Sequence, residues 1–321
     1  MTLPVLGLVI PCYNEEEVLH ETTARLIPLL GKMREDGLIS DRSAIFYVDD
    51  GSRDRTWSLI EKLSGVHPEV CGIKLSCNRG HQNALLCGLM TAPGDVLISI
   101  DADLQDDLDA IPQMVRHYRN GCDIVYGVRR RRDTDTFFKR FTAEGYYKLM
   151  AAMKVDIIFN HADYRLLSRR AVESLSEYRE VNLFLRGLVR LLGYPSAIVE
   201  YDRAERFAGE SKYPLRKMAS FAWQGITSFS IAPLRLITMM GFVVSIGSLA
   251  LASWALIVKL LVHGAFPGWA STVVPLYFLG GVQLLSLGTI GEYIGKIYME
   301  SKGRPRFHVS QRLGQALQQD H

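Results

Sequence analysis

The sequence has 321 residues, of which 48% are hydrophobic and 22% charged, and a formal net charge of +3. This balance is typical of a folded chain long enough for two domains, and it excludes an intrinsically disordered protein. Five cysteines without a CxxC pair predict reduced, structural thiols rather than a disulfide framework or a cysteine-bound metal. The low net charge argues against a nucleic-acid partner, despite the four consecutive arginines at 129–132.

Strands and helices alternate along the first hundred residues. Apolar segments with the pattern of buried strands stand in VLGLVIPCYNEEEVL, AIFYVDDGSRDRTWSLIEKL, VCGIKLSCN and DVLISIDAD, and helical patterns separate them. This alternation predicts an α/β fold, with a mostly parallel sheet and helices on both faces. The carboxyl ends of parallel strands meet at one edge, where such sheets bind ligands. Polar residues gather there at 11–15, 49–50, 78–80 and 101–105, and no GxGxxG or P-loop motif explains them.

The acidic stretch VLISIDADLQDDLDAIP, residues 96–112, divides into two parts. Asp101 and Asp103 alternate on a strand and therefore point to one side, where two ionised carboxylates require a cation. Oxygen ligands of this kind, with the Gln105 amide beside them, suit Mg²⁺ or Mn²⁺ held together with substrate phosphates. The carboxylates at 106, 107 and 109 precede a predicted helix, and we expect them to stabilise its N-terminus.

Two long uncharged segments, Ile237–Val258 and Ser271–Gly291, stand in the last third of the chain. Each is long enough to cross a hydrocarbon core of about 30 Å as a helix, which predicts a two-helix transmembrane hairpin. A buried helical pair is the alternative. The connection HGAFPGWAS has no Lys or Arg, whereas basic residues precede the first segment and follow the second. With no basic start of a signal peptide, this predicts a multi-pass inner-membrane protein with both termini cytoplasmic.

Four motifs carry a family resemblance. VIPCYNE, VDDGSRDRT, DADLQ and GESKY followed by a hydrophobic pair resemble the family 2 glycosyltransferases of the GT-A fold. Nearly the whole chain is similar to the polyprenyl-phosphate sugar transferases of that family, which include dolichol-phosphate mannose synthase and the aminoarabinose transferase of lipid A modification. HADYRLLSRRAVESL and FLRGLVRLLGY favour the bactoprenol glucosyltransferase branch. The chain departs from the pattern at His81 and His161, where relatives often carry Lys and Gly.

The resemblance implies a donor site built from the strand ends. Its nucleoside-binding residues would be Pro11, Tyr13, Glu15 and Asp50. Asp101 would lie near the ribose or the donor sugar. Asp103 and Gln105 would bind the Mg²⁺ or Mn²⁺ ion that bridges the diphosphate.

The resemblance also implies a basic site for an acceptor phosphate. Its residues would be Arg129, Arg132, Arg203, Arg206, Ser211 and Lys212. The predicted catalytic set consists of Asp101, Asp103, Asp163, Arg206 and Lys212. Asp163 would position the acceptor or the sugar, with a structural ion pair to Arg165 as the alternative. Attraction to anionic lipid headgroups is the alternative for the basic residues.

We therefore expect metal-dependent, inverting transfer of a single sugar from a nucleotide-sugar to polyprenyl phosphate at the cytoplasmic membrane face. UDP-glucose and undecaprenyl phosphate are the first choice, for O-antigen or other lipopolysaccharide modification. GDP-mannose, UDP-GlcNAc and an aminoarabinose donor are the alternatives. A processive polysaccharide synthase would carry a QxxRW segment, which is absent, and a nucleotide-sugar sensor would not need the DAD-x-Q set. The resemblance also implies a homo-tetramer, and a flippase and a downstream transferase as partners.

The expected organisation has four parts. A cytoplasmic GT-A domain would span residues 1–212, and an amphipathic juxtamembrane segment would span 213–233. The hairpin would span 234–298, with helices at about 236–260 and 271–295, and a cytoplasmic tail would follow at 299–321.

Overall fold

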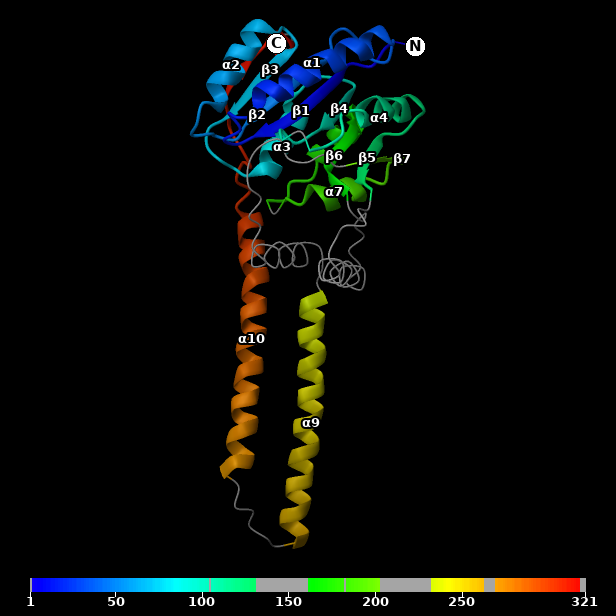
Figure 1. Cartoon of the computed structure of the whole chain (residues 1–321). Helices are drawn as coiled ribbons and strands as arrows, with labels where there is room; N and C mark the ends of the chain where they lie inside the picture. The colour runs from blue at the N-terminus through cyan, green and yellow to red at the C-terminus, as the bar shows by residue number, and fades with distance from the viewer. Residues whose placement is uncertain are drawn as a thin grey trace. The chain divides into compact units, whose positions relative to one another are not determined.

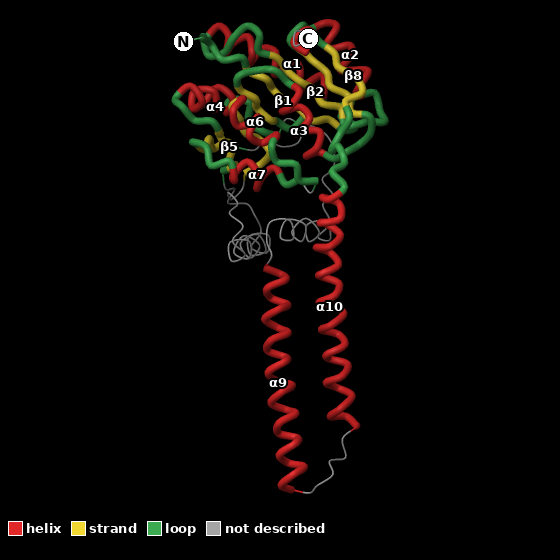
Figure 2. Tube along the Cα trace, turned by 180° about the vertical axis from the view of Figure 1, so that it is seen from behind, coloured by secondary structure: helices red, strands yellow, loops and turns green. Residues whose placement is uncertain are grey.

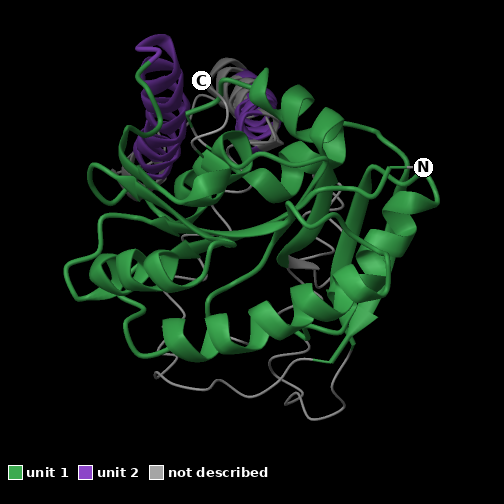
Figure 3. Cartoon of the chain, turned by 90° about the horizontal axis from the view of Figure 1, so that it is seen from above, with its two compact units in different colours: residues 1–151, 156–215, 304–321 green, residues 152–155, 216–303 purple. Residues whose placement is uncertain are grey.

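The computed structural model describes residues 2–103, 105–130, 161–181, 183–202, 232–262 and 269–317. The chain forms two compact units, which Figure 3 shows in different colours. Unit 1 comprises Met1–Ala151, Asp156–Leu215 and Arg304–His321, and unit 2 comprises Ala152–Val155 and Arg216–Gly303. Unit 1 therefore contains all the strand ends that the sequence marks as a site.

Unit 1 is built around one mixed sheet (Figure 1). Within the described residues its eight strands follow the order β7-β5-β6-β4-β1-β2-β3-β8. Their bounds are β1 Leu6–Cys12, β2 Ala44–Asp49, β3 Val70–Leu75, β4 Val96–Ser99, β5 Ile124–Arg129, β6 His161–Ser168, β7 Ser196–Tyr201 and β8 Val309–Leu313. β1 to β4 form a parallel block, whereas β6 and β8 run antiparallel to their neighbours. The predicted α/β sheet is present, and it is mixed rather than mostly parallel.

Helices cover both faces of this sheet. They are α1 Leu19–Glu35, α2 Thr56–Val66, α3 His81–Thr91, α4 Ala110–Arg119, α6 Arg169–Ser176 and α7 Leu185–Leu191. Leu8 and Ile10 of β1 join the core formed with α1, α2 and α4. Val9 points to the opposite face, where a Cβ added to Gly88 of α3 would lie 2.3 Å from Val9 Cγ1. β1 is therefore buried on both sides, which explains its almost unbroken apolar sequence.

The chain returns to unit 1 after unit 2 and adds β8 at the edge of the sheet (Figure 2). β8 pairs antiparallel with β3, and just beyond this ladder Ser76 N donates to His308 O at 2.9 Å. Gly314 follows with a φ of +100°, and a Cβ there would lie 2.6 Å from Cys71 Sγ. Part of the stretch 299–321, predicted as a tail, thus completes the sheet.

Unit 2 contains two long helices, α9 (Ala232–Val262) and α10 (Trp269–Ser301), which contact each other. Among the residues that the structure describes, no helix is both long enough and apolar enough to cross a membrane. The predicted two-helix transmembrane hairpin and the predicted multi-pass location in the inner membrane are therefore wrong. The prediction rested on the length of the two uncharged segments, and the described helices do not meet the combined requirement of length and apolarity.

Candidate functional site

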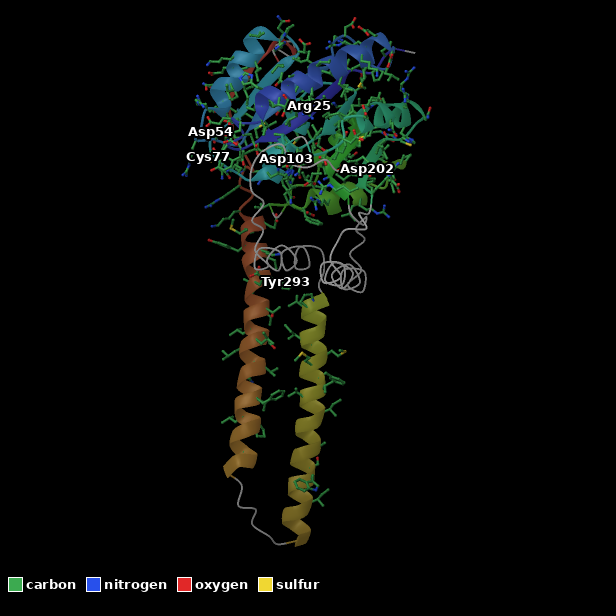
Figure 4. All side chains as sticks on the ribbon, in the orientation of Figure 1. Arg25, Asp54, Cys77, Asp103, Asp202 and Tyr293 are labelled. Carbon is green, nitrogen blue, oxygen red and sulfur yellow. The ribbon has the colours of Figure 1, made fainter. Side chains whose placement is uncertain are left out.

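The parallel block brings its polar carboxyl ends together at one edge of the sheet. Pro11 is buried near the end of β1, and Cys12 lies beside Asp49 in register with β2. Asp50 N donates to Cys12 O at 2.9 Å, which holds the two strand ends together beyond the ladder. β4 pairs with β1 on the other side, and Figure 4 labels Asp103 shortly after it. The structure thus gathers the polar residues as the strand pattern indicates.

Hydrogen bonds tie the turn after β1 to the turn after β2. Asn14, at a left-handed φ of 55°, donates its N–H to Ser52 Oγ at 3.0 Å. Glu15 N donates to Thr56 Oγ1 at 2.9 Å. Tyr13 precedes these contacts and is 40% exposed. An exposed aromatic ring on a fixed turn can stack on a nucleobase, so the geometry accords with the predicted nucleoside site, which stays a prediction.

Asp50 is 2% exposed and ties the turn after β2 to the turn after β3. Its carboxylate accepts the N–H of Arg79 at 2.7 Å and the N–H of Gly80 at 2.8 Å. Burial raises the pKa of Asp50, although these two hydrogen bonds oppose the shift. Gly51 has a φ of +67°, and a Cβ there would lie 2.7 Å from Asn78 N. Asp50 therefore shapes this edge directly, and its contact with a base stays a prediction.

Asp101 and Asp103 follow the end of β4 rather than alternating on it as predicted, and Asp163 lies on the neighbouring antiparallel strand β6. In the pairing of β4 with β6, Ser99 lies beside Arg165, and continuing that register places Asp101 beside Asp163. His81, the first residue of α3, has its Nε2 3.7 Å from Asp101 Oδ1 and 3.8 Å from Asp163 Oδ2. Burial, ahead of the charges of nearby aspartates, raises the pKa of Asp101 to about 6, although His81 opposes the shift. An additional cation would stabilise the ionised form of Asp101.

Two arginines hold Asp163. Arg165 is 2% exposed, and its Nη2 donates to Asp163 Oδ1. Arg186 of α7 donates from Nε and Nη2, at 3.3 and 3.1 Å, to the two oxygens of Asp163. Although burial would raise it, these two charges hold the pKa of Asp163 well below its usual range. The ion pair with Arg165, predicted as the structural alternative, is thus present. Arg186 also binds Asp163, and no sequence motif predicts this contact.

Asp103 and Gln105 lie where the family resemblance places a metal ion. Gln105 is 8% exposed, and its N–H donates to Asp103 Oδ1 at 3.2 Å. In the described part of the chain, no group of three His, Cys, Asp or Glu side chains is arranged to hold a metal ion. The available donors are carboxylate and amide oxygens beside Asp101, and such donors suit a hard cation that takes further ligands from a diphosphate. The residues present therefore fit Mg²⁺ or Mn²⁺.

Asp106 is the centre of a buried contact that sequence reasoning missed. The sequence predicts it at the start of a helix, but α4 begins only at Ala110. Asp106 is 3% exposed and accepts hydrogen bonds from the Tyr201 hydroxyl and from Arg129 Nη2, the latter at 3.4 Å. Arg129 Nε donates to the same hydroxyl at 3.1 Å. A buried acid thus holds a predicted acceptor-binding arginine in place. The contact depends on the pairing of β5 with β7, which puts Arg129 beside Tyr201 and which the sequence does not indicate.

Several predicted acceptor residues lie outside the described residues. They are Arg132, Arg203, Arg206, Ser211 and Lys212. Their roles, including the catalytic roles of Arg206 and Lys212, stay predictions. Arg129 is therefore the one predicted acceptor residue whose surroundings the described part of the chain provides.

Comparison with known proteins gives three kinds of match. The model described as Glycosyl transferase family 2 matches residues 8–176. The glycosyltransferase YkoT of Bacillus subtilis is 53% identical over 95% of this chain and 91% of its own length. The bactoprenol glucosyl transferase of Shigella phage SfV is 41% identical over 95% of this chain and 97% of its own length. A crystal structure of glucosyl-3-phosphoglycerate synthase from Mycobacterium tuberculosis with Mn²⁺, uridine diphosphate and phosphoglyceric acid matches at 20% identity and a TM-score of 0.47, over 70% of this chain and 76% of that one.

Proposed function

We propose, because this chain belongs to glycosyl transferase family 2, that it transfers a single sugar from a nucleotide-sugar to a polyprenyl phosphate. The chain is a glycosyltransferase, and the resemblance carried by its motifs is confirmed. The name of the phage relative states a glucosyl group and bactoprenol, a polyprenol, and the likeness spans nearly the full length of both proteins. Glucose from UDP-glucose to undecaprenyl phosphate is therefore the first pair to test.

The observation that carries the proposal is the gathering of acidic and basic groups around Asp101. Asp103 and Gln105 supply oxygen ligands on one side. Burial opposes the charged form of Arg129 and Arg186, but acidic and phenolic neighbours raise the pKa of both: Tyr201 and Asp106 for Arg129, Asp163 for Arg186, and Asp101 after them for each. A nucleotide-sugar diphosphate with its metal suits the acidic side, and an acceptor phosphate suits the basic side. When bound, a divalent ion would neutralise the leaving diphosphate as a Lewis acid.

The acceptor needs no general base. A phosphate monoester loses its second proton at about pH 6, so an acceptor oxygen is already anionic at neutral pH. Asp163, held ionised by Arg165 and Arg186, is too weak a base to take a proton under these conditions. We infer a single displacement, in which a phosphate oxygen bonds to the anomeric carbon as that carbon separates from the nucleoside diphosphate. One displacement inverts the configuration of the sugar.

A transfer assay with the purified protein tests this function. Radiolabelled UDP-glucose, UDP-GlcNAc, GDP-mannose and an aminoarabinose donor are each supplied with undecaprenyl phosphate and Mg²⁺ or Mn²⁺, and label in the lipid is measured. We expect transfer from one of these donors. Asp103→Asn should lower kcat/KM more than about 100-fold, because losing even a residue that supports a metal ligand costs about 10- to 100-fold. The exposed control Asp41→Asn should leave the rate unchanged.

A different result of this assay would refute each part of the proposal. Failure of every donor to label the lipid would overturn the reaction. Full activity in EDTA would overturn the metal, and label in a long polymer would instead favour a processive synthase.

A further inference from the structure

Arg186 uses only part of its hydrogen-bonding capacity on Asp163. Its Nε and Nη2 groups donate to the two carboxylate oxygens, as a fork that fixes the plane of the guanidinium. Its Nη1 group makes no hydrogen bond within the described part of the chain, and the side chain is 42% exposed. The guanidinium therefore keeps hydrogen-bonding capacity on a side chain that is partly open to solvent beside the site.

Asp163 has a second counter-ion besides Arg186. Arg165 already contributes a full charge from a fully buried position, and its Nη1 is fixed by donating to Leu185 O at 3.3 Å. One carboxylate thus faces two guanidinium groups, and Arg186 is the more exposed of the two. Because the buried Arg165 cannot reach solvent, Arg186 is the arginine of this pair that can meet a ligand.

A second partly exposed arginine lies near the first. Arg129 is 28% exposed and is fixed by Asp106 and Tyr201. Asp101 acts electrostatically on both guanidinium groups, and Arg129 acts on Arg186. Two like charges held in proximity by separate buried anchors form an arrangement that an anion would stabilise.

The anchoring of α7 makes this arrangement rigid. Leu185 N donates to Gln82 Oε1 at 3.1 Å, which joins the start of α7 to the first turn of α3. The side chains of Leu185, Leu188 and Val189, which belong to α7, are buried. Arg186 is therefore held from its backbone as well as from its side chain, so it meets a ligand without first losing much conformational freedom.

We propose that Arg186 binds a phosphate oxygen of a substrate and, with Arg129, forms a phosphate site beside Asp101. The proposal rests on the proposed transferase function, since it assigns a residue to that same site. The planar guanidinium of arginine matches phosphate oxygens in charge and geometry. The phosphate belongs either to the acceptor monoester or to the donor diphosphate, and kinetics with each substrate varied in turn distinguishes the two.

The test uses the full chain with Arg186→Gln, Arg186→Lys and the control Arg190→Gln. Arg190 lies one turn further along α7 and is exposed, so it matches Arg186 in residue type and helix. Initial rates are measured with UDP-glucose varied at fixed undecaprenyl phosphate, and then with the lipid varied at fixed UDP-glucose. We expect Arg186→Gln to raise one KM about 10- to 150-fold, the loss typical of a hydrogen bond to a charged group. Arg186→Lys should recover part of this loss, and Arg190→Gln should behave as the wild type.

The KM that rises identifies the phosphate. A higher KM for undecaprenyl phosphate assigns the acceptor, and a higher KM for UDP-glucose assigns the donor diphosphate. Unchanged KM values with a lower melting temperature would show a merely structural Arg186 and overturn the proposal. Equilibrium binding of UDP and of undecaprenyl phosphate to the same variants keeps this test separate from the transfer reaction. Weaker binding of one probe by Arg186→Gln supports the phosphate site even if no donor is transferred, and equal binding of both overturns it.

Discussion

Asp163→Asn removes one charge and almost no volume from a contact in which two arginines share one carboxylate. Arg165 is 2% exposed and Asp163 is 12% exposed, so water cannot hydrate Arg165 once its partner is neutral. Removing one partner of a buried ion pair costs about 3 to 5 kcal/mol. Arg186 adds little to this cost, because it is 42% exposed and can be rehydrated. We therefore expect a loss of about 3 to 5 kcal/mol in the free energy of unfolding.

Urea unfolding followed by tryptophan fluorescence measures this loss. The control Glu21→Gln breaks an exposed helical pair with Arg25 and should cost less than about 0.5 kcal/mol. Adding Arg165→Met to Asp163→Asn should restore part of the stability, because the stranded charge is then removed as well. A loss below about 1 kcal/mol for Asp163→Asn at neutral pH would refute the idea that Arg165 depends on this carboxylate.

The pH dependence provides an independent check. The pKa of folded Asp163 lies below the 3.8 of an unperturbed carboxyl group, so its ion pairs contribute fully above that pH. This contribution is lost as the pH falls through the folded pKa, because the wild type then becomes protonated too. The stability gap between the wild type and Asp163→Asn should stay constant from about pH 7 to about pH 5, and narrow below about pH 4. A gap that narrows already near pH 6 would contradict the low pKa.

Two further substitutions test the neighbouring contacts. Tyr201→Phe removes the hydroxyl that joins Asp106 to Arg129, and we expect a loss of about 1 to 3 kcal/mol in unfolding free energy together with a lower rate of sugar transfer. An unchanged rate would show that Arg129 is held without this hydroxyl. Gly51→Ala should destabilise more than Gly37→Ala, because both glycines have φ near +65° but only at Gly51 would the new Cβ meet backbone atoms. Thermal unfolding compares the two, and equal shifts would contradict the close approach.

The parallel block could be predicted from the sequence because each strand is a short apolar run that ends in polar residues. That pattern is local. Strands that alternate with helices form a parallel sheet, because strand–helix–strand connections are right-handed. The convergence of Asp50 with Asp101 follows as well, since parallel strands end at one edge. The pairing of Arg186 with Asp163 could not be predicted in this way. It joins β6 to α7 through side chains alone, and an arginine on an amphipathic helix has the same pattern whether it meets solvent or a buried acid.

The role of Asp106 shows a different limit. Three acids before a predicted helix carry a strong capping signal, and that local signal favours a helix start over a tertiary contact. In the structure Asp106 instead accepts a hydrogen bond from the Tyr201 hydroxyl, almost a hundred residues away along the chain. The long helices of unit 2 show the opposite error, because there a local run of uncharged residues indicated membrane spans that the described helices do not support.

The edge strand β8 is synthesised long after β3, the strand with which it pairs. Ser310 of β8 donates to Lys74 O across 236 positions of sequence, and all of unit 2 is made in between. While a ribosome makes this chain, the edge of β3 stays open from the time residue 75 emerges until residues 309–313 follow. Open strand edges pair readily with other chains, and contacts of such long range form slowly. Yield in the cell should therefore depend on how well the nascent chain shields the open edge of β3 until β8 is made.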